Sequence, residues 1–248
     1  MPNIAKPSIQ SLLIQMQVNG HALSTGTAFV VDTAKGPHLI TNRHNVTGRN
    51  QDTGAPLSPT GGLPTEVVVL HNAKGQLGTW VPRVEPLYVG DAPRWREHPT
   101  LGAKADFVAL PLSGLEGIDL YPHTPENPGP AIFVGPADPV SVIGFPFGIT
   151  AGGVFGVWAT GFLASEPAVD FNDRPIQLID CRSRQGQSGS PVIAYRSGGM
   201  VAMADGGSAA FAGPVWKFIG IYSGRINMES DLGIVWKAAA INELIHAL

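Results

Sequence analysis

Charged side chains are scarce in this sequence. They make up 14% of its 248 residues, against about 25% in an ordinary globular domain. A coiled coil or long helix needs many charges, and a disordered chain combines high charge with low hydrophobicity. Because 44% of the residues are hydrophobic, the chain fits neither class and is expected to bury a core.

Cysteine is almost absent. Cys181 is the only one, so no disulfide can form within the chain. The N-terminal segment has no long apolar run, because Gln10, Gln15 and Gln17 interrupt it, and no secretory signal is expected. Both observations favour a reducing compartment, and we predict a cytoplasmic protein.

Basic charge is not in excess either. The formal net charge is −3, so neither nucleic acid nor an anionic membrane surface is predicted as a partner. Residues 139–165 carry no charge and are long enough to cross a bilayer. They contain two prolines and six glycines, which disfavour a helix. We therefore predict two buried strands around a turn instead of a membrane span.

Turn-forming residues, in contrast, are abundant. The chain has 31 glycines and 22 prolines, a composition typical of short strands joined by turns in an all-β protein. Apolar patterns predict strands at 14–18, 27–31, 38–41, 67–70, near Trp80, and at 106–112, 131–134, 139–144, 154–163, 175–180, 190–195, 216–223 and 232–236. Residues 198–213 are small and predict a loop, and residues 237–248 predict an amphipathic helix.

The strands divide into two groups. A proline-rich connection at 113–130 separates them, and no repeat of fixed period is present. We predict a single domain, 1–248, with approximate lobes at 12–112 and 131–236 and a terminal helix at 237–248.

The segment Gly186-Gln187-Ser188-Gly189-Ser190-Pro191 has the features of an exposed nucleophile. Gly186 allows a sharp turn, after which its N–H and that of Ser188 can point at one position and form an oxyanion hole. Gly189 has no side chain to obstruct an approaching acyl group. The alternative is a Gly/Ser-rich β-turn without chemistry, which this motif alone leaves equally open.

A serine hydroxyl needs a base to act as a nucleophile. Among the 7 histidines, His44 follows the apolar run His38-Leu39-Ile40, which would hold its side chain firmly while it faces a cleft. The other histidines lie in polar, terminal or strand contexts and are interpreted as structural or exposed. No two of them have the spacing of zinc ligands, and we predict neither metal nor cofactor.

The base in turn needs an acidic partner that orients it. Asp106 stands alone before Phe107-Val108-Ala109-Leu110-Pro111-Leu112, where an apolar strand would partly bury it. This position favours a catalytic carboxylate over the alternative, a residue that merely caps the strand.

Four motifs together resemble the chymotrypsin-fold serine peptidases. They are Gly26-Thr27-Ala28-Phe29-Val30-Val31, Leu39-Ile40-Thr41-Asn42-Arg43-His44, Asp106-Phe107-Val108-Ala109-Leu110 and Gly186-Gln187-Ser188-Gly189-Ser190-Pro191. The order His, Asp, Ser is the order of that family. Gly144-Phe145-Pro146-Phe147-Gly148, and Asp180 before the serine motif, are similar to the HtrA-type bacterial branch. The resemblance extends over roughly residues 12–247.

This resemblance implies two antiparallel six-stranded β-barrels with the site between them and a short C-terminal helix. It implies a hydrolase, a serine endopeptidase acting on protein or peptide substrates. His44 would be its general base, Asp106 the orienting acid and Ser188 the nucleophile. The N–H groups of Gly186 and Ser188 would form the oxyanion hole. The oligomeric state stays open.

The sequence also departs from relatives in that family. Secreted zymogens carry an aspartate just before the serine, whereas Gln187 cannot form the ion pair that follows N-terminal cleavage. We therefore predict no activation by such cleavage. No PDZ domain is expected after residue 248, and Arg43 beside the base is unexplained.

The resemblance places the primary substrate pocket at residues 182–185 and at the end of a strand. Its candidate residues are Arg182, Ser183, Gln185, Ser223, Gly224 and Arg225. An arginine there would favour an acidic substrate residue, because a guanidinium pairs well with a carboxylate. The alternative is that both arginines point into solvent.

Three alternatives to an active serine peptidase fit the sequence less well. An α/β-hydrolase would place its acid and histidine after the serine, and only His246 follows Ser188. Cys181 precedes the serine motif and is interpreted as a buried structural residue. The main rival is a catalytically silent or partner-activated member of the same family that acts as a protein-binding or regulatory module.

Overall fold

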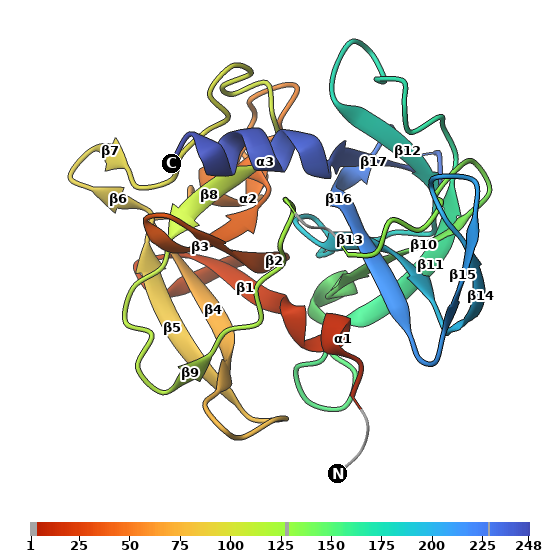
Figure 1. Cartoon of the computed structure of the whole chain (residues 1–248). Helices are drawn as coiled ribbons and strands as arrows, with labels where there is room; N and C mark the ends of the chain where they lie inside the picture. Colours follow the sequence, from red (N-terminus) through yellow and green to blue (C-terminus); the bar gives the residue numbers. More distant parts are fainter. Residues whose placement is uncertain (1–3, 127–128, 228) are drawn as a thin grey trace.

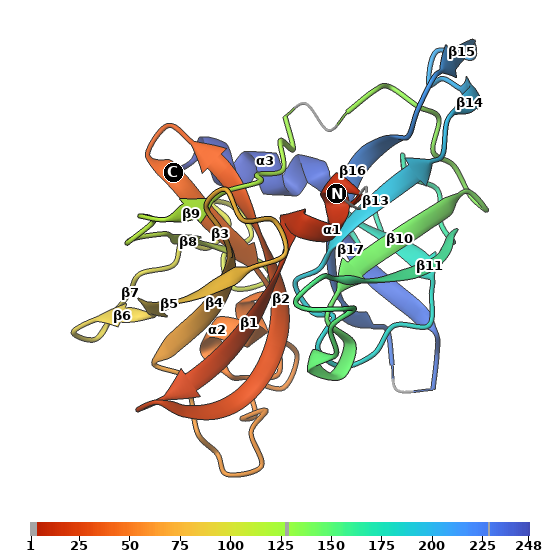
Figure 2. The ribbon, with the colours of Figure 1, turned by 90° about the horizontal axis from the view of Figure 1, so that it is seen from below.

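The structure is a computed structural model that describes residues 4–126, 129–227 and 229–248. Residues 127–128 of the predicted connection and residues 1–3 lie outside this description. Two strand-rich lobes lie side by side, and both ends of the described chain lie at the surface (Figure 1, Figure 2).

The first lobe precedes the connection, except for its last short strand, which lies within residues 113–130. Its elements are α1 (Lys6–Gln10), β1 (Ser11–Val18), β2 (His21–Thr33), β3 (Gly36–Thr41), α2 (Arg43–Thr47), β4 (Glu66–Ala73), β5 (Trp80–Pro86), β6 (Tyr88–Val89), β7 (Ala92–Pro93), β8 (Val108–Pro111) and β9 (Ile118–Asp119).

The sheet of this lobe follows the order β5-β4-β1-β2-β3-β8, with β9 added beside β4. Alternation in β1 buries Ile14 and Met16, and these side chains enter a core with residues of β2, β3, β4 and β8. β8 is continued at its outer edge by the segment 94–96, because Arg96 and Ala109 exchange two backbone hydrogen bonds of 2.8 and 3.0 Å. This pairing is an isolated bridge, and the end strands β5 and β8 do not pair with each other, so among the described residues this sheet of seven strands is not a closed six-stranded barrel.

The second lobe follows the connection. Its elements are β10 (Pro139–Gly144), the 3₁₀ turn η1 (Pro146–Gly148), β11 (Val157–Leu163), β12 (Ile176–Asp180), β13 (Pro191–Arg196), β14 (Gly199–Ala202), β15 (Ser208–Phe211), β16 (Val215–Arg225), β17 (Leu232–Lys237) and α3 (Ala238–His246).

Six of these strands form a closed barrel in the order β10-β11-β12-β17-β16-β13. Its core contains Val142, Ile179 and Val192, all essentially without exposed surface. The predicted all-β fold with a C-terminal helix is confirmed. The uncharged stretch 139–165 forms β10 and β11 around a turn, and no helix of the described residues is long and apolar enough to span a membrane.

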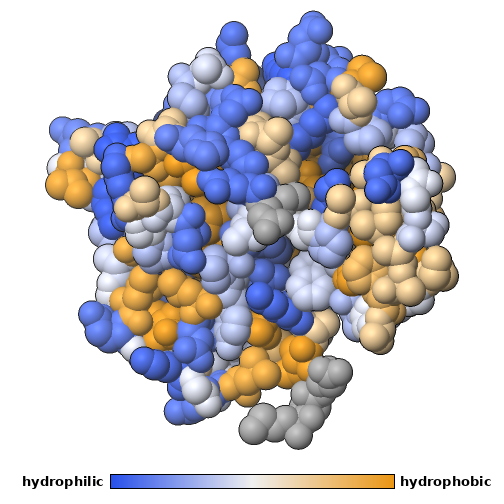
Figure 3. All heavy atoms as spheres, viewed as in Figure 1, coloured by the Kyte–Doolittle hydropathy of each residue, from blue (hydrophilic) through white to orange (hydrophobic). Residues whose placement is uncertain are grey.

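Residues 198–213 correct one expectation, because they form the hairpin β14–β15 instead of a loop. Asp205-Gly206 supplies its turn, and Gly206 has φ +85°, as hairpin turns require. The hairpin exposes 72% of Met200, and Figure 3 shows apolar side chains gathered over this end of the lobe. The predicted strand 131–134 is reduced to an isolated bridge between Ile132 and Met203.

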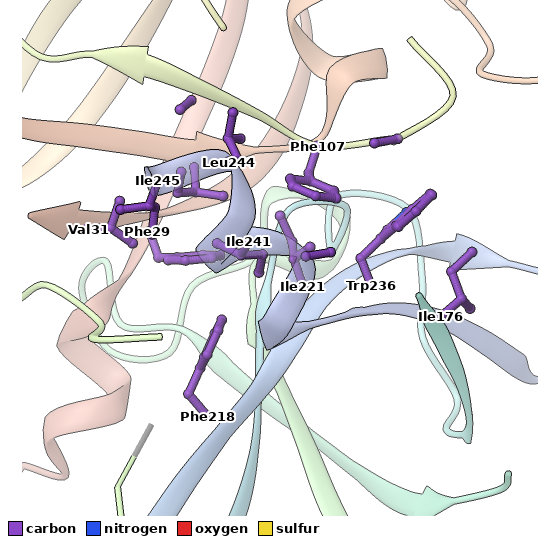
Figure 4. Close-up of a cluster of buried hydrophobic side chains, with 14 of the residues drawn as sticks. Phe29, Val31, Phe107, Ile176, Phe218, Ile221, Trp236, Ile241, Leu244 and Ile245 are labelled. Atoms are coloured by element: carbon purple, nitrogen blue, oxygen red, sulfur yellow. The ribbon is translucent and has the colours of Figure 1, made fainter. Parts of the chain in front are cut away.

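Helix α3 joins the two lobes. It runs from the end of β17 across to the first lobe (Figure 1). Ile241 and Leu244 enter a core cluster that includes Phe107 of the first lobe and Trp236 of the second (Figure 4). The apolar face of the helix therefore holds the lobes against each other, with the cleft between them.

Candidate active site

The position of His44 follows from a change of backbone conformation. β3 ends at Thr41, Asn42 is extended with φ −69° and ψ 147°, and α2 begins at Arg43. Gly48 ends this short helix in the left-handed conformation, with φ +64°. His44 thus lies on a helical turn held by a buried strand, not on the strand end itself.

Asp106 holds His44 at two points. One carboxylate oxygen lies 2.7 Å from the ring Nδ1, and the other accepts the backbone N–H of His44 at 3.0 Å. The carboxyl group is almost fully buried just before β8. This arrangement fixes the ring orientation and favours the tautomer that leaves Nε2 as the acceptor.

Two further side chains position Asp106. The Ser223 hydroxyl donates to the same oxygen that contacts Nδ1. The Asn42 amide donates to the backbone carbonyl of Asp106 at 2.6 Å. Ser223 was predicted to line the substrate pocket, and no role was predicted for Asn42. The only signal for Asn42 in the sequence is its position two residues before His44.

The balance of two effects sets the basicity of His44. Burial alone lowers its pKa, because a dry surrounding disfavours the charged imidazolium. The charge and hydrogen bond of Asp106 act in the opposite direction and raise the pKa of His44 above its ordinary value of 6.5. His44 is therefore a stronger base than a free histidine.

Two residues of the first lobe hold Ser188 in place through its backbone carbonyl group. Its carbonyl accepts the Thr27 N–H at 2.9 Å and the Asn45 amide at 3.2 Å. The next residue, Gly189, has φ +89°, and a Cβ there would lie 2.0 Å from the Thr27 carbonyl oxygen. Only glycine fits this close approach, which explains the residue that follows the serine.

The N–H groups of Gly186 and Ser188 are not used inside the protein. Among the described residues, neither donates a hydrogen bond, although Gln187 between them donates to the Arg184 carbonyl at 3.2 Å. Gly186 has φ +94°, and a Cβ there would lie 2.4 Å from the Phe145 carbonyl oxygen. Among the described residues, the loop thus leaves the N–H groups of Gly186 and Ser188 unpaired, in a conformation that only glycine tolerates at position 186.

One hollow of about 260 Å³ brings the candidate residues together. His44, Asp106, Ser188 and Ser223 all line it. Within the described part of the chain, no hydrogen bond joins the Ser188 hydroxyl to the imidazole. Such contacts are often long in the absence of substrate.

Comparison with known families identifies the fold. Residues 26–203 match the profile of the trypsin-like peptidase domain. The chain belongs to the trypsin-like peptidase family. A search of curated proteins finds no significant match.

Solved structures of trypsin-like peptidases share the fold. The Rv3671c protease from M. tuberculosis, in its active form, is 17% identical over 97% of this chain and 81% of its own, with a TM-score of 0.51. The thermostable serine protease AL20 from an extremophilic microorganism is 13% identical, with 98% of each chain covered and a TM-score of 0.53. These likenesses confirm the predicted fold class, and the family confirms a serine-type endopeptidase domain.

The residues expected to line the primary pocket of this trypsin-like peptidase are not gathered in one place. Ser223 and Arg225 line the hollow that contains His44. Gln185 lines a different hollow, with Phe147 and Leu23. Arg182 is exposed, and Arg182, Ser183 and Gly224 line neither hollow.

Ser183 is instead committed to the protein interior, where its hydroxyl is hydrogen-bonded to that of Tyr222. Burial raises the pKa of Tyr222 to about 12, so this phenol stays neutral. Arg43, unexplained by the sequence, forms an ion pair of 2.8 Å with Glu97.

A cysteine nucleophile or a metal ion would give this trypsin-like peptidase a different chemistry. Cys181 is buried, and burial raises the pKa of its thiol to about 11, so it is no nucleophile near neutral pH. In the described ranges, no cluster of three or more His, Cys, Asp or Glu side chains could hold a metal ion.

Proposed function

We propose that this trypsin-like peptidase hydrolyses peptide bonds through His44, Asp106 and Ser188 and an acyl-enzyme intermediate. The observation that carries the proposal is the two-point contact of Asp106 with His44, in the same hollow as Ser188. Each group then has a defined step in acyl transfer.

The Ser188 oxygen attacks the substrate carbonyl, and its proton passes to Nε2 of His44. The imidazolium that forms is stabilised by the negative charge of Asp106. The negative carbonyl oxygen is received by the N–H groups of Gly186 and Ser188. When the tetrahedral intermediate collapses, the carbon–nitrogen bond breaks and the proton moves from Nε2 to the leaving amine.

The acyl-enzyme is then hydrolysed by the same groups. His44 takes a proton from water as the water oxygen attacks the ester carbonyl. The proton returns to the Ser188 oxygen as the ester bond breaks, which releases the acid and restores the enzyme.

We further propose that this site needs no N-terminal cleavage to become ordered. Gln187 occupies the position before the nucleophile and is 1% exposed. Its amide oxygen accepts the Arg184 N–H at 2.7 Å. The neutral, buried side chain of Gln187 thus stabilises the loop that carries Ser188. In a zymogen, an ion pair with the new N-terminus would do this instead.

An extended peptide is the substrate that this cleft suits. β13 pairs with β16 only as far as Ile221, and Tyr222 binds the loop that carries Ser188. Ser223–Arg225 continue β16 beyond that pairing, so a peptide can add along them as a further strand. We propose one domain, with both lobes contributing to the site, and retain the cytoplasmic location as a prediction from the single cysteine.

Partner activation is the second candidate. It is favoured by the missing hydrogen bond between Ser188 and His44 in the described residues, which substrate or a partner would have to form. Under this second candidate, Ser188 of the isolated protein would not react with a serine-directed label, whereas under the first proposal it would.

The test is labelling with a fluorophosphonate, which reacts only with an activated serine. The wild-type protein and Ser208→Ala, which removes an exposed hydroxyl from β15, should both be labelled. Ser188→Ala and His44→Ala should not. Equal labelling of Ser188→Ala would overturn the assignment of the nucleophile, and an unlabelled but folded wild type would favour partner activation.

A further inference from the structure

The hollow that contains His44 and Ser188 has an unusual charge. Lys104, Arg174 and Arg225 line it, and Asp52 is the one carboxylate among its lining residues besides Asp106. Asp106 is already committed to His44 and Ser223. The hollow is therefore cationic, although the chain as a whole has a net charge of −3.

These cations come from separate parts of the fold. Lys104 precedes Asp106 in the first lobe, Arg174 lies just before β12, and Arg225 ends β16. Their convergence on one hollow is thus a property of the folded chain, and no run of basic residues in the sequence indicates it.

Two of these side chains lack an acidic partner. Within residues 4–126, 129–227 and 229–248, neither Lys104 nor Arg174 forms an ion pair. Both side chains are exposed. Three less exposed arginines are paired instead: Arg43 with Glu97, Arg94 with Glu85, and Arg196 with Asp138. Lys104 and Arg174 thus leave positive charge available beside the site.

The apolar residues that line the hollow strengthen an ion pair between these cations and an acidic substrate side chain. Ile176, Ile234 and Trp236 contribute apolar surface to the same hollow, and Ile176 and Trp236 are buried. A charge pair beside apolar surface and partly removed from water interacts more strongly than one in bulk solvent.

We propose that this hollow selects substrates with an acidic side chain, two to four residues before the scissile bond. A peptide that extends β16 along Ser223–Arg225 would carry these residues past Arg174 and Lys104. The inference rests on the proposed peptidase function and adds its substrate class: acidic peptides on the acyl side of the cleaved bond.

The test uses internally quenched peptide pools, each with one residue fixed at one position. Pools with Glu two to four residues before the scissile bond should be cleaved with a kcat/KM about fivefold above the matching Gln pools, the size expected for a partly exposed ion pair. Raising the salt concentration should reduce this ratio, because salt screens exposed charges.

Single-residue variants test whether Lys104 and Arg174 cause the preference for Glu over Gln. Arg174→Gln and Lys104→Gln should each lower the ratio of Glu to Gln cleavage, because each removes one positive charge from the lining of the hollow. Lys35→Gln removes an equal charge from the turn between β2 and β3, outside the hollow, and should keep the wild-type ratio.

Fluorophosphonate labelling distinguishes failure of the acidic preference from failure of the proposed peptidase function. If Ser188 is labelled and the Glu and Gln pools are cleaved equally, the acidic preference is overturned and the peptidase function stands. If Arg174→Gln, Lys104→Gln and Lys35→Gln all lower the ratio alike, the selection is a net-charge effect and this hollow does not cause it. If wild-type Ser188 is not labelled, the peptidase proposal itself fails.

Discussion

The carbonyl oxygen of Gln185 accepts a hydrogen bond of 2.6 Å from the backbone N–H of Phe147. In a planar trans peptide the C=O and N–H groups point in opposite directions. The N–H of Gly186 is therefore turned away from Phe147, as the proposed oxyanion hole requires. Phe147 has φ +55° and is 63% exposed, a conformation that is costly for a residue other than glycine.

This contact predicts opposite effects for two substitutions of Phe147. Phe147→Pro removes the N–H and cannot adopt a positive φ, so kcat should fall by about 10²–10³, the loss that follows removal of an oxyanion-hole donor. Phe147→Gly keeps the N–H and suits the backbone, so kcat should stay within a few-fold of wild type. Equal activity of the two folded variants in a peptide-cleavage assay would contradict the role of this contact.

The raised pKa of His44 predicts the pH dependence of cleavage. His44 must be neutral to accept the serine proton, so kcat/KM should rise with pH through a pKa above 6.5. Asp106→Asn removes the charge that raises this pKa and should lower kcat by about 10⁴. Peptide cleavage measured from pH 5 to 9 tests both; a flat wild-type profile would argue against His44 as the base.

The Ser223 side chain is predicted to position Asp106 and not to contact substrate, which pairs only with the backbone here. Ser223→Ala removes a hydrogen bond to a charged group, so kcat should fall about tenfold with little change in KM. Ser223→Thr keeps the hydroxyl and should restore most of kcat. A rise in KM alone, with kcat unchanged, would show that Ser223 acts as a substrate contact.

Two buried histidines predict a loss of stability in acid. Burial is the main cause that lowers the pKa of His71 to about 4 and of His123 to about 3. The unfolded chain binds their protons below about pH 6.5, so the free energy of unfolding should fall as the pH drops below that value. The slope should be about 1.4 kcal/mol per pH unit for each histidine.

Urea denaturation between pH 7 and 4.5 would measure this slope. His123→Phe should remove about half of it, because the ring can still pack against Phe29 and Phe218 but takes up no proton. An unchanged slope in a stable His123→Phe variant would exclude His123 as a cause.

The sequence predicted the elements whose signals are local. The alternation around Ile14 and Met16 indicated β1, and the apolar run after Asp106 indicated β8. The order of the histidine, aspartate and serine motifs predicted which side chains would line one hollow. The hairpin β14–β15 was missed because small residues obscure the alternation, although Asp205-Gly206 is a turn signal.

Contacts between distant segments could not be predicted in this way. Ser223 reaches Asp106 across 117 positions, and no pattern in either segment indicates it. Arg182 lies close to Ser188 in the sequence and was a candidate for the pocket, but it does not line the hollow. Arg174, on the turn before β12, was not a candidate and lines it together with Arg225. The cations meet in one hollow only because loops from both lobes fold over the cleft, and the sequence does not show how these loops fold.

The packing of α3 has a consequence for synthesis of the protein. Ile241 and Leu244 complete a core that Phe107 and Trp236 supply from opposite lobes, and the ribosome adds these helix residues after every strand. A nascent chain that already contains His44, Asp106 and Ser188 still lacks the helix that holds the lobes together. If the proposed peptidase function holds, proteolytic competence would then appear only when translation has passed α3.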